Sequence, residues 1–317
     1  MNTAKTPLTR RSALKLGLVG GAGLGMLPLI LSAQESAPLP LNTKVIPSSG
    51  KKIPVIGLGT NQYGVSTEEE LAPRREVLRQ FPKLGLTLID TAPGYGKSEE
   101  VLGKLIAELG IRDQLFLATK VTVDDGDAKK GAAMLEESFK RLQTKHIELV
   151  QVHSLRGWQT LLPLLRDWKK EGRISYYGVT TSDDKQYPEL IKVLESEALD
   201  FVQFDYSVGN RNAEEKILPL VAEKKIASLV NMPLGGRRGA NLLSKTTDKP
   251  LPDFAKEINA TSWAQILLKY VVSHPAVTAA IPGTTKLKHL EDNAAAARGV
   301  MPDAGMRKRI EEAFAAL

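Results

Sequence analysis

The sequence contains no cysteine, and this absence excludes several kinds of site. Disulfide bonds, thiolate nucleophiles and cysteine-ligated metals all need a residue that this chain does not have. The histidines, at positions 146, 153, 274 and 289, are scattered and form no HxxxH pair. The sequence therefore gives no support to a zinc site, and we predict that the protein holds no metal ion.

Aromatic residues are also scarce, at 5% of the 317 residues, so a core of branched aliphatic side chains is expected. The net charge is +7, but much of the excess lies in residues 1–33, which contain basic residues and no acidic one. No run of Lys and Arg is interleaved with aromatic residues. The composition thus makes no case for binding nucleic acid.

The N-terminal segment has the pattern of an export signal. Arg10 and Arg11, in the sequence TRRSALK, precede an uncharged, glycine-containing stretch over residues 16–31. Small residues follow, and this order predicts a signal peptide over residues 1–33, which resembles the twin-arginine type. The apolar stretch is shorter than the roughly 20 residues that cross a bilayer, so no stable membrane span is expected.

Alternatives stay open for this segment, which could be an uncleaved anchor or an ordinary signal with a chance pair of arginines. Cleavage could follow Ala33 or Ala37, and residues 34–42 would then form a linker. The twin-arginine route carries folded proteins, often with their cofactor already bound. We therefore predict a periplasmic protein that is exported by the twin-arginine machinery and acquires any nucleotide before export.

Beyond the linker, strand and helix signals alternate without a break. The segment LNTKVIPSSGKKIPVIGLGT predicts a β-hairpin, followed by a first barrel strand at about 56–60. Further strands are predicted at 86–91, 115–121, 148–153, 174–180, 201–206, 226–231 and 277–282. Helices are predicted at 67–83, 98–109, 127–143, 158–171, 187–197, 213–224, 261–273, 286–297 and 303–315.

This alternation predicts an α/β fold, a (β/α)8 TIM barrel with an N-terminal β-hairpin, in a single domain over residues 43–317. A doubly wound open sheet is the alternative, but no glycine-rich turn of the required spacing follows the first strand. The one long connection, over residues 232–260, is expected to be functional.

Four ionisable side chains stand at or just beyond the ends of predicted strands: Asp90, Tyr95, Lys120 and His153. A parallel barrel gathers such positions around one mouth. A phenol can deliver a proton to a substrate, and a neighbouring ammonium would stabilise the phenolate that remains. A carboxylate can hold the ammonium, and an imidazole can donate a hydrogen bond to the substrate. Taken singly, each residue also has a structural explanation, such as a turn, a salt bridge or a buried histidine.

The segment DTAPGYG at 90–96, followed by SEEVLG at 98–103, together with ATK at 118–120 and VH at 152–153, resembles the aldo-keto reductases. The resemblance extends from about Ile53 to Asn293. It implies a (β/α)8 barrel that binds a nicotinamide nucleotide without a Rossmann domain. It also implies a catalytic tetrad of Asp90, Tyr95, Lys120 and His153.

The resemblance further implies where the nicotinamide binds. The sequence GVTT at 178–181 stands where the family usually has GVSN, which makes Thr180 and Thr181 contacts of the nicotinamide amide. Thr181 lacks the paired donor and acceptor of an amide side chain. Gln203 matches the glutamine that binds the same carboxamide, and Asn231 occupies the place where many members stack an aromatic ring.

Two further segments are implied to bind the rest of the nucleotide. The loop PLGGRRG at 233–239 resembles the segment that clasps the pyrophosphate, through Leu234, Gly235 and Arg237. Residues 281–293 run from a strand end into a helix N-terminus, which suits a phosphate. The candidates in this segment for the 2′-phosphate and adenine are Gly283, Thr284, Thr285, Lys286 and Asn293. NADPH is the expected cofactor, with NADH as an alternative.

We therefore predict a monomer that reduces a small aldehyde or ketone with NADPH by hydride transfer, with Tyr95 as the general acid. Two alternatives stay open: an exported nucleotide-binding or sensor protein with little turnover, and a dehydrogenase that recycles tightly bound NADP(H). The sequence does not specify the substrate, although Tyr63 and Trp158 are candidate walls of its pocket. Trp158 could equally pack at the start of a helix.

Overall fold

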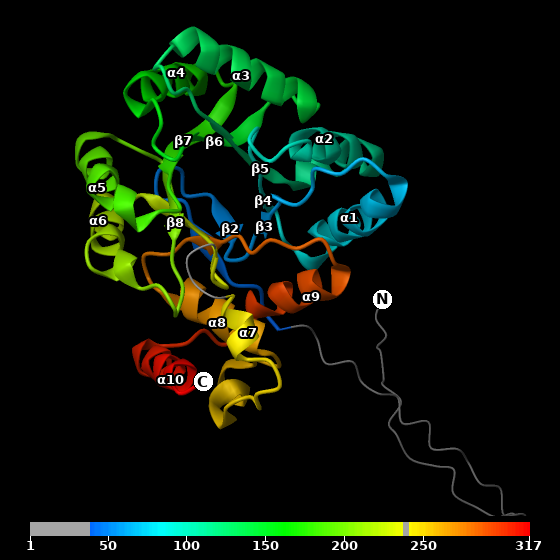
Figure 1. The fold of residues 1–317 in the computed structure, drawn as a ribbon, viewed down its shortest axis with the longest axis vertical. Coiled ribbons are helices and arrows are strands. Elements are labelled where there is room, and N and C mark those ends of the chain that lie inside the picture. Colours follow the sequence, from blue (N-terminus) through cyan, green and yellow to red (C-terminus); the bar gives the residue numbers. More distant parts are fainter. Residues whose placement is uncertain (1–38, 237–240) are drawn as a thin grey trace, which may run out of the picture. The chain divides into compact units, whose positions relative to one another are not determined.

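A computed structural model describes residues 39–236 and 241–317, so the predicted signal peptide lies outside the described residues. At the centre is an eight-stranded parallel sheet, and helices surround it (Figure 1). Its strands pair in chain order. They are β3 (Leu58–Gly59), β4 (Leu88–Asp90), β5 (Phe116–Val121), β6 (Ile147–His153), β7 (Ile174–Thr180), β8 (Phe201–Asp205), β9 (Ala227–Asn231) and β10 (Ala279–Ala280).

The sheet closes between its first and last strands. Parallel bridges join Ile56 to Ala280 and Gly59 to Gly283, and Gly57 N donates to Ala280 O at 2.8 Å. A side chain at Gly59 would place its Cβ 2.8 Å from the backbone oxygen of Ile281, so the close approach requires glycine. The predicted (β/α)8 barrel is therefore confirmed.

The outer layer consists of helices, the first six of which alternate with the barrel strands. They are α1 (Glu68–Gln80), α2 (Ser98–Leu109), α3 (Ala128–Arg141), α4 (Trp158–Lys170), α5 (Tyr187–Ser196), α6 (Ile217–Lys224), α7 (Leu242–Lys245), α8 (Trp263–Ser273), α9 (Leu287–Ala296) and α10 (Ala304–Ala315). Local signals set several starts: Thr67 and Glu70 form a capping box at α1, and Asp127 caps α3. The long connection contains α7 and a 3₁₀ helix over Asp253–Ile258.

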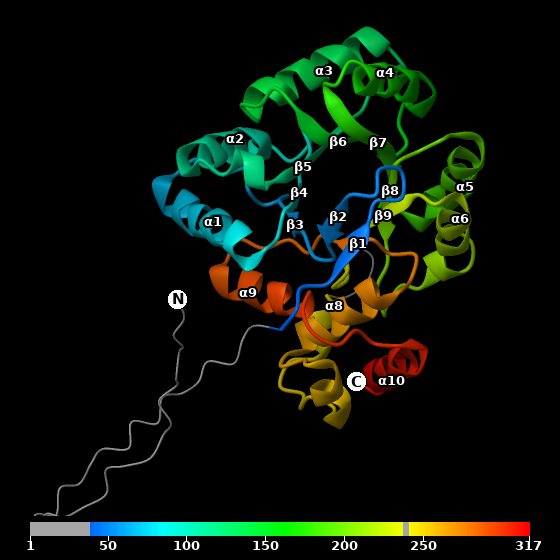
Figure 2. The same ribbon diagram turned by 180° about the vertical axis from the view of Figure 1, so that it is seen from behind.

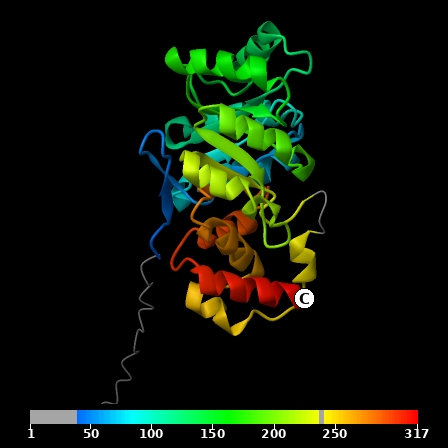
Figure 3. The same cartoon turned by 90° about the vertical axis from the view of Figure 1, so that its left-hand side faces the viewer.

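The predicted hairpin is present and covers the amino-terminal end of the barrel (Figure 2). Strands β1 (Thr43–Val45) and β2 (Lys52–Pro54) pair antiparallel. Ile46 and Ile53 are buried in the same cluster as the interior residues of the barrel. The hairpin and α7 lie on opposite sides of the ring (Figure 3), so the hairpin leaves the carboxyl ends of the strands open.

The ordered domain begins earlier than the predicted linker at 34–42 implies. Leu41 forms a β-bridge with Arg298, and Asn42 Nδ2 donates to the carbonyls of Ala297 at 3.1 Å and Gly299 at 2.9 Å. Residues 39–42 are therefore part of the barrel domain, because they bind the segment that follows α9.

Side chains inside the barrel change from apolar to polar along β4, β5, β6 and β8. In β5, Phe116 and Ala118 belong to the apolar interior cluster, while Leu117 and Val121 face the helices. The alternation of a strand then directs Lys120 inward, above Ala118. The same alternation directs Asp90, His153 and Gln203 inward. Because these residues lie toward the carboxyl ends of their strands, the site forms at that end of the barrel.

Candidate active site

The predicted tetrad lies at the carboxyl ends of three neighbouring strands. Asp90 ends β4, Lys120 is near the end of β5, and His153 ends β6. Tyr95 lies between β4 and α2, in a turn closed by the hydrogen bond from Tyr95 N to Ala92 O at 3.0 Å. The structure thus brings together side chains that lie far apart in the sequence.

Lys120 connects Asp90 and Tyr95. Its Nζ donates to Asp90 Oδ2 at 2.7 Å, to Thr91 O at 2.8 Å and to the Tyr95 hydroxyl at 3.4 Å. The side chains of Lys120 and Asp90 are only 1% and 3% exposed. Water therefore does little to screen the ion pair, and removing either partner would leave a buried unpaired charge.

Asp90 keeps Lys120 protonated despite its burial. Burial alone would lower the pKa of Lys120, but the negative charge of Asp90 acts against it, with a smaller contribution from Tyr95, and the pKa is raised above its ordinary value. An ammonium therefore stands beside the phenol oxygen. It can stabilise the negative charge that remains when the phenol gives up its proton.

His153 completes the group from the next strand. Its ring meets Tyr95 edge to face, with centroids 6.2 Å apart and planes at 86°. Burial, together with the positive charges of Lys120 and Arg156, lowers the pKa of His153 to about 4. The imidazole is therefore neutral at neutral pH, and it has one N–H to donate.

The strand register places Thr180 and Gln203 beside His153. His153 pairs with Thr180 across β6 and β7, and Thr180 pairs with Gln203 across β7 and β8. Gln203 Oε1 accepts from Gln151 Nε2 at 2.9 Å, and both side chains are buried. The sequence reasoning missed Gln151, although its position between Leu149 and His153 in the alternation of β6 marks it as an interior residue.

Thr181 and Asn231 are joined by a hydrogen bond. Asn231 Nδ2 donates to Thr181 O at 3.0 Å. The Thr181 hydroxyl donates to Gln186 Oε1 and accepts from Asp183 N at 3.1 Å. Its proton is thus used within the protein, whereas the resemblance implied a contact with the nicotinamide amide.

The family model described as "Aldo/keto reductase family" matches residues 55–313. The chain belongs to the aldo/keto reductase family. Methylglyoxal reductase YeaE of Escherichia coli (strain K12) is 30% identical over 264 residues, which cover 80% of this chain and 89% of that protein. Family membership confirms the predicted enzyme class, an NAD(P)H-dependent oxidoreductase.

Two solved aldo-keto reductase structures from Klebsiella pneumoniae are also similar, each at 27% identity. The complex with NADPH has a TM-score of 0.71 and covers 87% of this chain and 96% of that one. The complex with NADP and acetate has a TM-score of 0.70 and covers 85% of this chain and 94% of that one. The likeness thus extends over most of each chain.

In this member of the aldo/keto reductase family, the residues around Gln203 fit the nicotinamide end of a nucleotide. Asn231 Oδ1 is buried and has no hydrogen-bond partner within residues 39–236 and 241–317. A buried acceptor normally finds a donor. The carboxamide of a nicotinamide has both N–H donors and a carbonyl oxygen, which would suit Asn231 Oδ1 and the Gln203 amide.

The segment that leads into α9 fits a phosphate. Lys286 is the N-cap residue of α9, and no side chain caps the first turn. Backbone N–H groups at such an end attract anions. Gly283 and Lys286 are exposed and Thr285 is half-buried, while Thr284 and Asn293 are buried.

The loop after β9 is described only as far as Gly236. Leu234 is joined to α7 through its carbonyl, which accepts from Leu242 N at 3.0 Å, and Gly235 N donates to Met232 O at 2.9 Å. Gly235 has φ of 84°, a conformation that favours glycine. Arg237, the predicted pyrophosphate contact, lies outside the described residues.

The prediction that Tyr63 forms a wall of the substrate pocket is wrong, and Trp158 follows the alternative that it packs at the start of a helix. Tyr63 has no exposed surface, and its hydroxyl donates to Thr284 O at 3.1 Å. Trp158 is 9% exposed, and its Nε1 donates to Glu189 Oε1 at 2.7 Å. Both rings pack within the domain, because proximity to a strand end does not determine which way a ring points.

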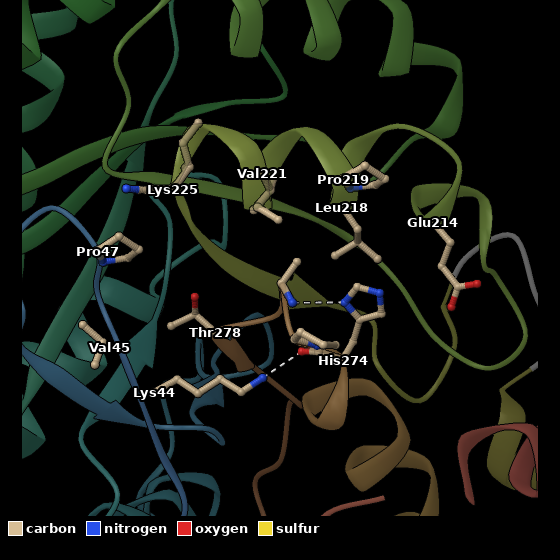
Figure 4. Close-up of a pocket in the computed structure, with 14 residues that line it drawn as sticks. Lys44, Val45, Pro47, Glu214, Leu218, Pro219, Val221, Lys225, His274 and Thr278 are labelled. Carbon is tan, nitrogen blue, oxygen red and sulfur yellow. Dashed lines mark hydrogen bonds between the residues drawn. The ribbon is translucent and has the colours of Figure 1, made fainter. Parts of the chain in front are cut away.

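A cavity of about 610 Å³ lies elsewhere, between the hairpin, α6 and the loop after α8 (Figure 4). Its lining includes Lys44, Leu218, Val221, His274 and Thr278, and none of the tetrad or predicted cofactor residues.

In the part of the chain that the structure describes, no helix is long and apolar enough to cross a membrane. The same residues contain no group of His, Asp or Glu side chains arranged to hold a metal ion.

Proposed function

We propose that the protein reduces a small aldehyde or ketone to the alcohol, with NADPH as the hydride donor and Tyr95 as the general acid. The observation that carries this proposal is the contact of Lys120 Nζ with both Asp90 Oδ2 and the Tyr95 hydroxyl. A phenol beside a buried ammonium is suited to protonate an oxygen on which negative charge develops.

Each side chain has its own task in this mechanism. Neutral His153 donates a hydrogen bond to the carbonyl oxygen and orients it. Tyr95 transfers its proton to that oxygen, and Lys120 stabilises the phenolate that remains. Asp90 keeps Lys120 charged and in place. The nucleotide, when bound, supplies the hydride that reaches the carbonyl carbon.

The substrate class follows from the mechanism only as far as a carbonyl group. The similar protein from Escherichia coli is named a methylglyoxal reductase, which makes methylglyoxal the first carbonyl to test. A panel of aliphatic aldehydes, sugar aldehydes and quinone-like carbonyls would then define the preferred substrate.

Replacing Tyr95 with phenylalanine tests the acid. Because only the hydroxyl is removed, we expect reduction of the best substrate to fall by at least about 10²-fold, while NADPH binding is nearly unchanged. Steady-state kinetics and a fluorescence titration with NADPH measure the two quantities. Tyr176→Phe is the matched control, because that hydroxyl contacts Ser49 on the hairpin. Undiminished reduction by Tyr95→Phe would remove Tyr95 as the acid.

The same measurements separate the alternative functions. Nucleotide binding without turnover of any carbonyl would favour a nucleotide-binding or sensor protein. Retention of NADP(H) through purification, with alcohol oxidation faster than carbonyl reduction, would favour a dehydrogenase that recycles its nucleotide.

We also propose that the protein is exported in folded form by the twin-arginine machinery and acts in the periplasm. The support is the sequence TRRSALK ahead of the uncharged stretch at 16–31. Replacing Arg10 and Arg11 with lysine should trap the precursor in the cytoplasm, as detected by fractionation and immunoblotting. Lys5→Arg is the control, and normal export of the double variant would indicate another route.

A further inference from the structure

The turn that follows His153 has an uncommon backbone conformation. Ser154 and Leu155 have φ of 54° and 59°, in the left-handed region that residues with side chains rarely adopt. Two such residues in succession keep this conformation only where the surroundings hold it. Because His153 directly precedes them, the contacts that hold this turn also influence the direction of the imidazole.

Gln186 is one residue that holds the turn. It ends the 3₁₀ helix Asp184–Gln186, which follows β7, and its Nε2 donates to Ser154 O at 2.9 Å. The turn itself is closed by the hydrogen bond from Arg156 N to His153 O at 3.2 Å. The amide of Gln186 thus ties the end of β6 to the segment beyond β7.

Thr181 sets the orientation of the Gln186 amide. Its hydroxyl donates to Gln186 Oε1, so Gln186 turns its Nε2 side toward Ser154. The Thr181 hydroxyl also accepts a hydrogen bond from Asp183 N at 3.1 Å. The backbone carbonyl of Thr181 accepts from Asn231 Nδ2 at 3.0 Å. A chain of hydrogen bonds therefore runs from the end of β9, past the end of β7, to the turn after β6.

We propose that Thr181 and Gln186 are positioning residues, which hold the imidazole of His153 in the direction that a carbonyl substrate requires. This inference rests on the proposed function, because it takes His153 as the group that orients the carbonyl. Thr181 then acts through Gln186 and not on the nicotinamide amide. The hydroxyl of Thr181 is suited to this role, because it donates to Gln186 and accepts from Asp183 at one atom.

A set of matched substitutions tests the assignment. Thr181→Val removes the hydroxyl at nearly constant volume, Thr181→Ser retains it, and Gln186→Leu removes the amide. Gln114→Leu is the control, because Gln114 is an exposed glutamine in the 3₁₀ helix that precedes β5, at the other end of the barrel.

We expect Thr181→Val and Gln186→Leu each to lower kcat/KM for the best carbonyl on the order of tenfold, since a small misplacement of an orienting group is costly. The Kd for NADPH should stay at the wild-type value in both. Thr181→Ser should recover most of the activity, and Gln114→Leu should keep all of it. Circular dichroism on heating verifies that each variant is folded.

A different pattern would overturn the proposal. If Thr181 contacts the nicotinamide directly, Thr181→Val weakens NADPH binding, while Gln186→Leu changes neither binding nor turnover. Failure of Thr181→Ser to recover activity would also contradict a role that depends on the hydroxyl.

A second measurement, by NMR, tests the positioning role without depending on turnover. The imidazole Cε1–H resonance of His153, assigned by its loss in His153→Asn, should shift in Thr181→Val and Gln186→Leu without any nucleotide. It should keep its wild-type position in Gln114→Leu. If the wild-type protein reduces no carbonyl, the proposed function fails, and the resonance still decides the positioning role. An unshifted resonance in both variants would overturn that role.

Discussion

His153 remains neutral because three influences act in one direction. Burial, Lys120 and Arg156 together lower the pKa of its imidazole to about 4. A histidine in water titrates near ~6.5, within the range of common assay conditions. In the proposed mechanism, the N–H of His153 that would orient the carbonyl is therefore present over the whole neutral range.

The lowered pKa predicts how stability depends on pH. Between the folded pKa of about 4 and the ordinary value of 6.5, the unfolded chain binds the extra proton and the folded one does not. The free energy of unfolding should therefore fall as the pH falls through this range. At about 1.4 kcal/mol per pKa unit the full effect would be about 3 kcal/mol, and the half-buried position of the ring brings it toward about 2 kcal/mol.

Urea denaturation of the wild-type protein and of His153→Asn, across this pH range, measures the effect. The variant should lose less stability on acidification than the wild-type protein. His274 contributes a similar dependence, because burial and Arg307 lower its pKa to about 4 as well, so some dependence remains in the variant. Curves of equal steepness would contradict the assignment to His153.

Single residues also show where sequence reasoning succeeds and where it stops. The meeting of Asp90, Lys120 and His153 could be predicted, because parallel strands deliver their carboxyl ends to one place. The partner of Thr181 could not, since it depends on the course of the chain beyond β7, which brings Gln186 back to the strand end. The inward packing of Tyr63 was likewise hidden, because the contact of its hydroxyl with Thr284 joins distant segments.

Among the elements, α2 is joined closely to its neighbours. Glu99 is 1% exposed and accepts from Thr119 Oγ1 on β5 at 2.6 Å and from Arg141 Nε on α3 at 2.8 Å. One turn further along α2, Gly103 faces the end of α3. Helix α2, which follows the turn that contains Tyr95, is thus held by the polar contacts of Glu99 with β5 and α3 and by the close approach of Gly103 to the backbone of Arg141.

Gly103→Ala should destabilise the protein, although alanine normally favours a helix. The added Cβ would lie 2.0 Å from the backbone oxygen of Arg141, and neither helix can move without losing contacts. We expect a loss of about 2–4 kcal/mol in the free energy of unfolding. Denaturant titration measures it.

Gly305→Ala in α10 is the matched control, because its Cβ would meet only Asp303 Oδ1 at 3.5 Å. That change should raise stability by up to about 1 kcal/mol. Effects of the same sign at the two positions would show that helix propensity, and not the α2–α3 contact, decides the outcome at Gly103.

The order and type of the barrel elements could be predicted, because strands and helices differ in the period of their hydrophobic residues. Their lengths could not always be predicted. Strand β3 consists of Leu58–Gly59 and β10 of Ala279–Ala280, both shorter than predicted, because the barrel closes there through isolated bridges. The elements within 232–260 were missed as well, since a segment rich in Gly, Lys and Pro shows no clear period.

For the whole molecule, the two ends of the barrel have different tasks. The hairpin closes the amino end, and Lys44 joins it to the last turn of α8 and the segment after it, through the carbonyls of Val272, His274 and Val277 at 2.8, 2.8 and 2.6 Å. The carboxyl end carries the polar side chains of the site. Because residues 39–42 bind the segment that follows α9, the described domain includes Leu39 and does not begin only at the hairpin.

This boundary leads to a prediction for shortened chains. A protein that begins at Leu39 keeps the contacts of residues 39–42 with 297–299 and the whole hairpin, so it should unfold at the same temperature as the full chain. A protein that begins at Ser48 loses β1 and the buried side chain of Ile46. Its unfolding temperature should be lower by at least about 5 °C, because removing one buried isoleucine alone costs about 2–5 kcal/mol.

Differential scanning calorimetry of the three proteins measures these temperatures, and Ile46→Ala in the chain that begins at Leu39 separates the apolar contact from the loss of β1. This variant should lie between the two shortened chains, since it keeps the pairing of β1 with β2. Equal stability of the chains that begin at Leu39 and Ser48 would mean that the hairpin covers the barrel without supporting it. A lower unfolding temperature for the chain that begins at Leu39 than for the full chain would instead place the start of the domain before that residue.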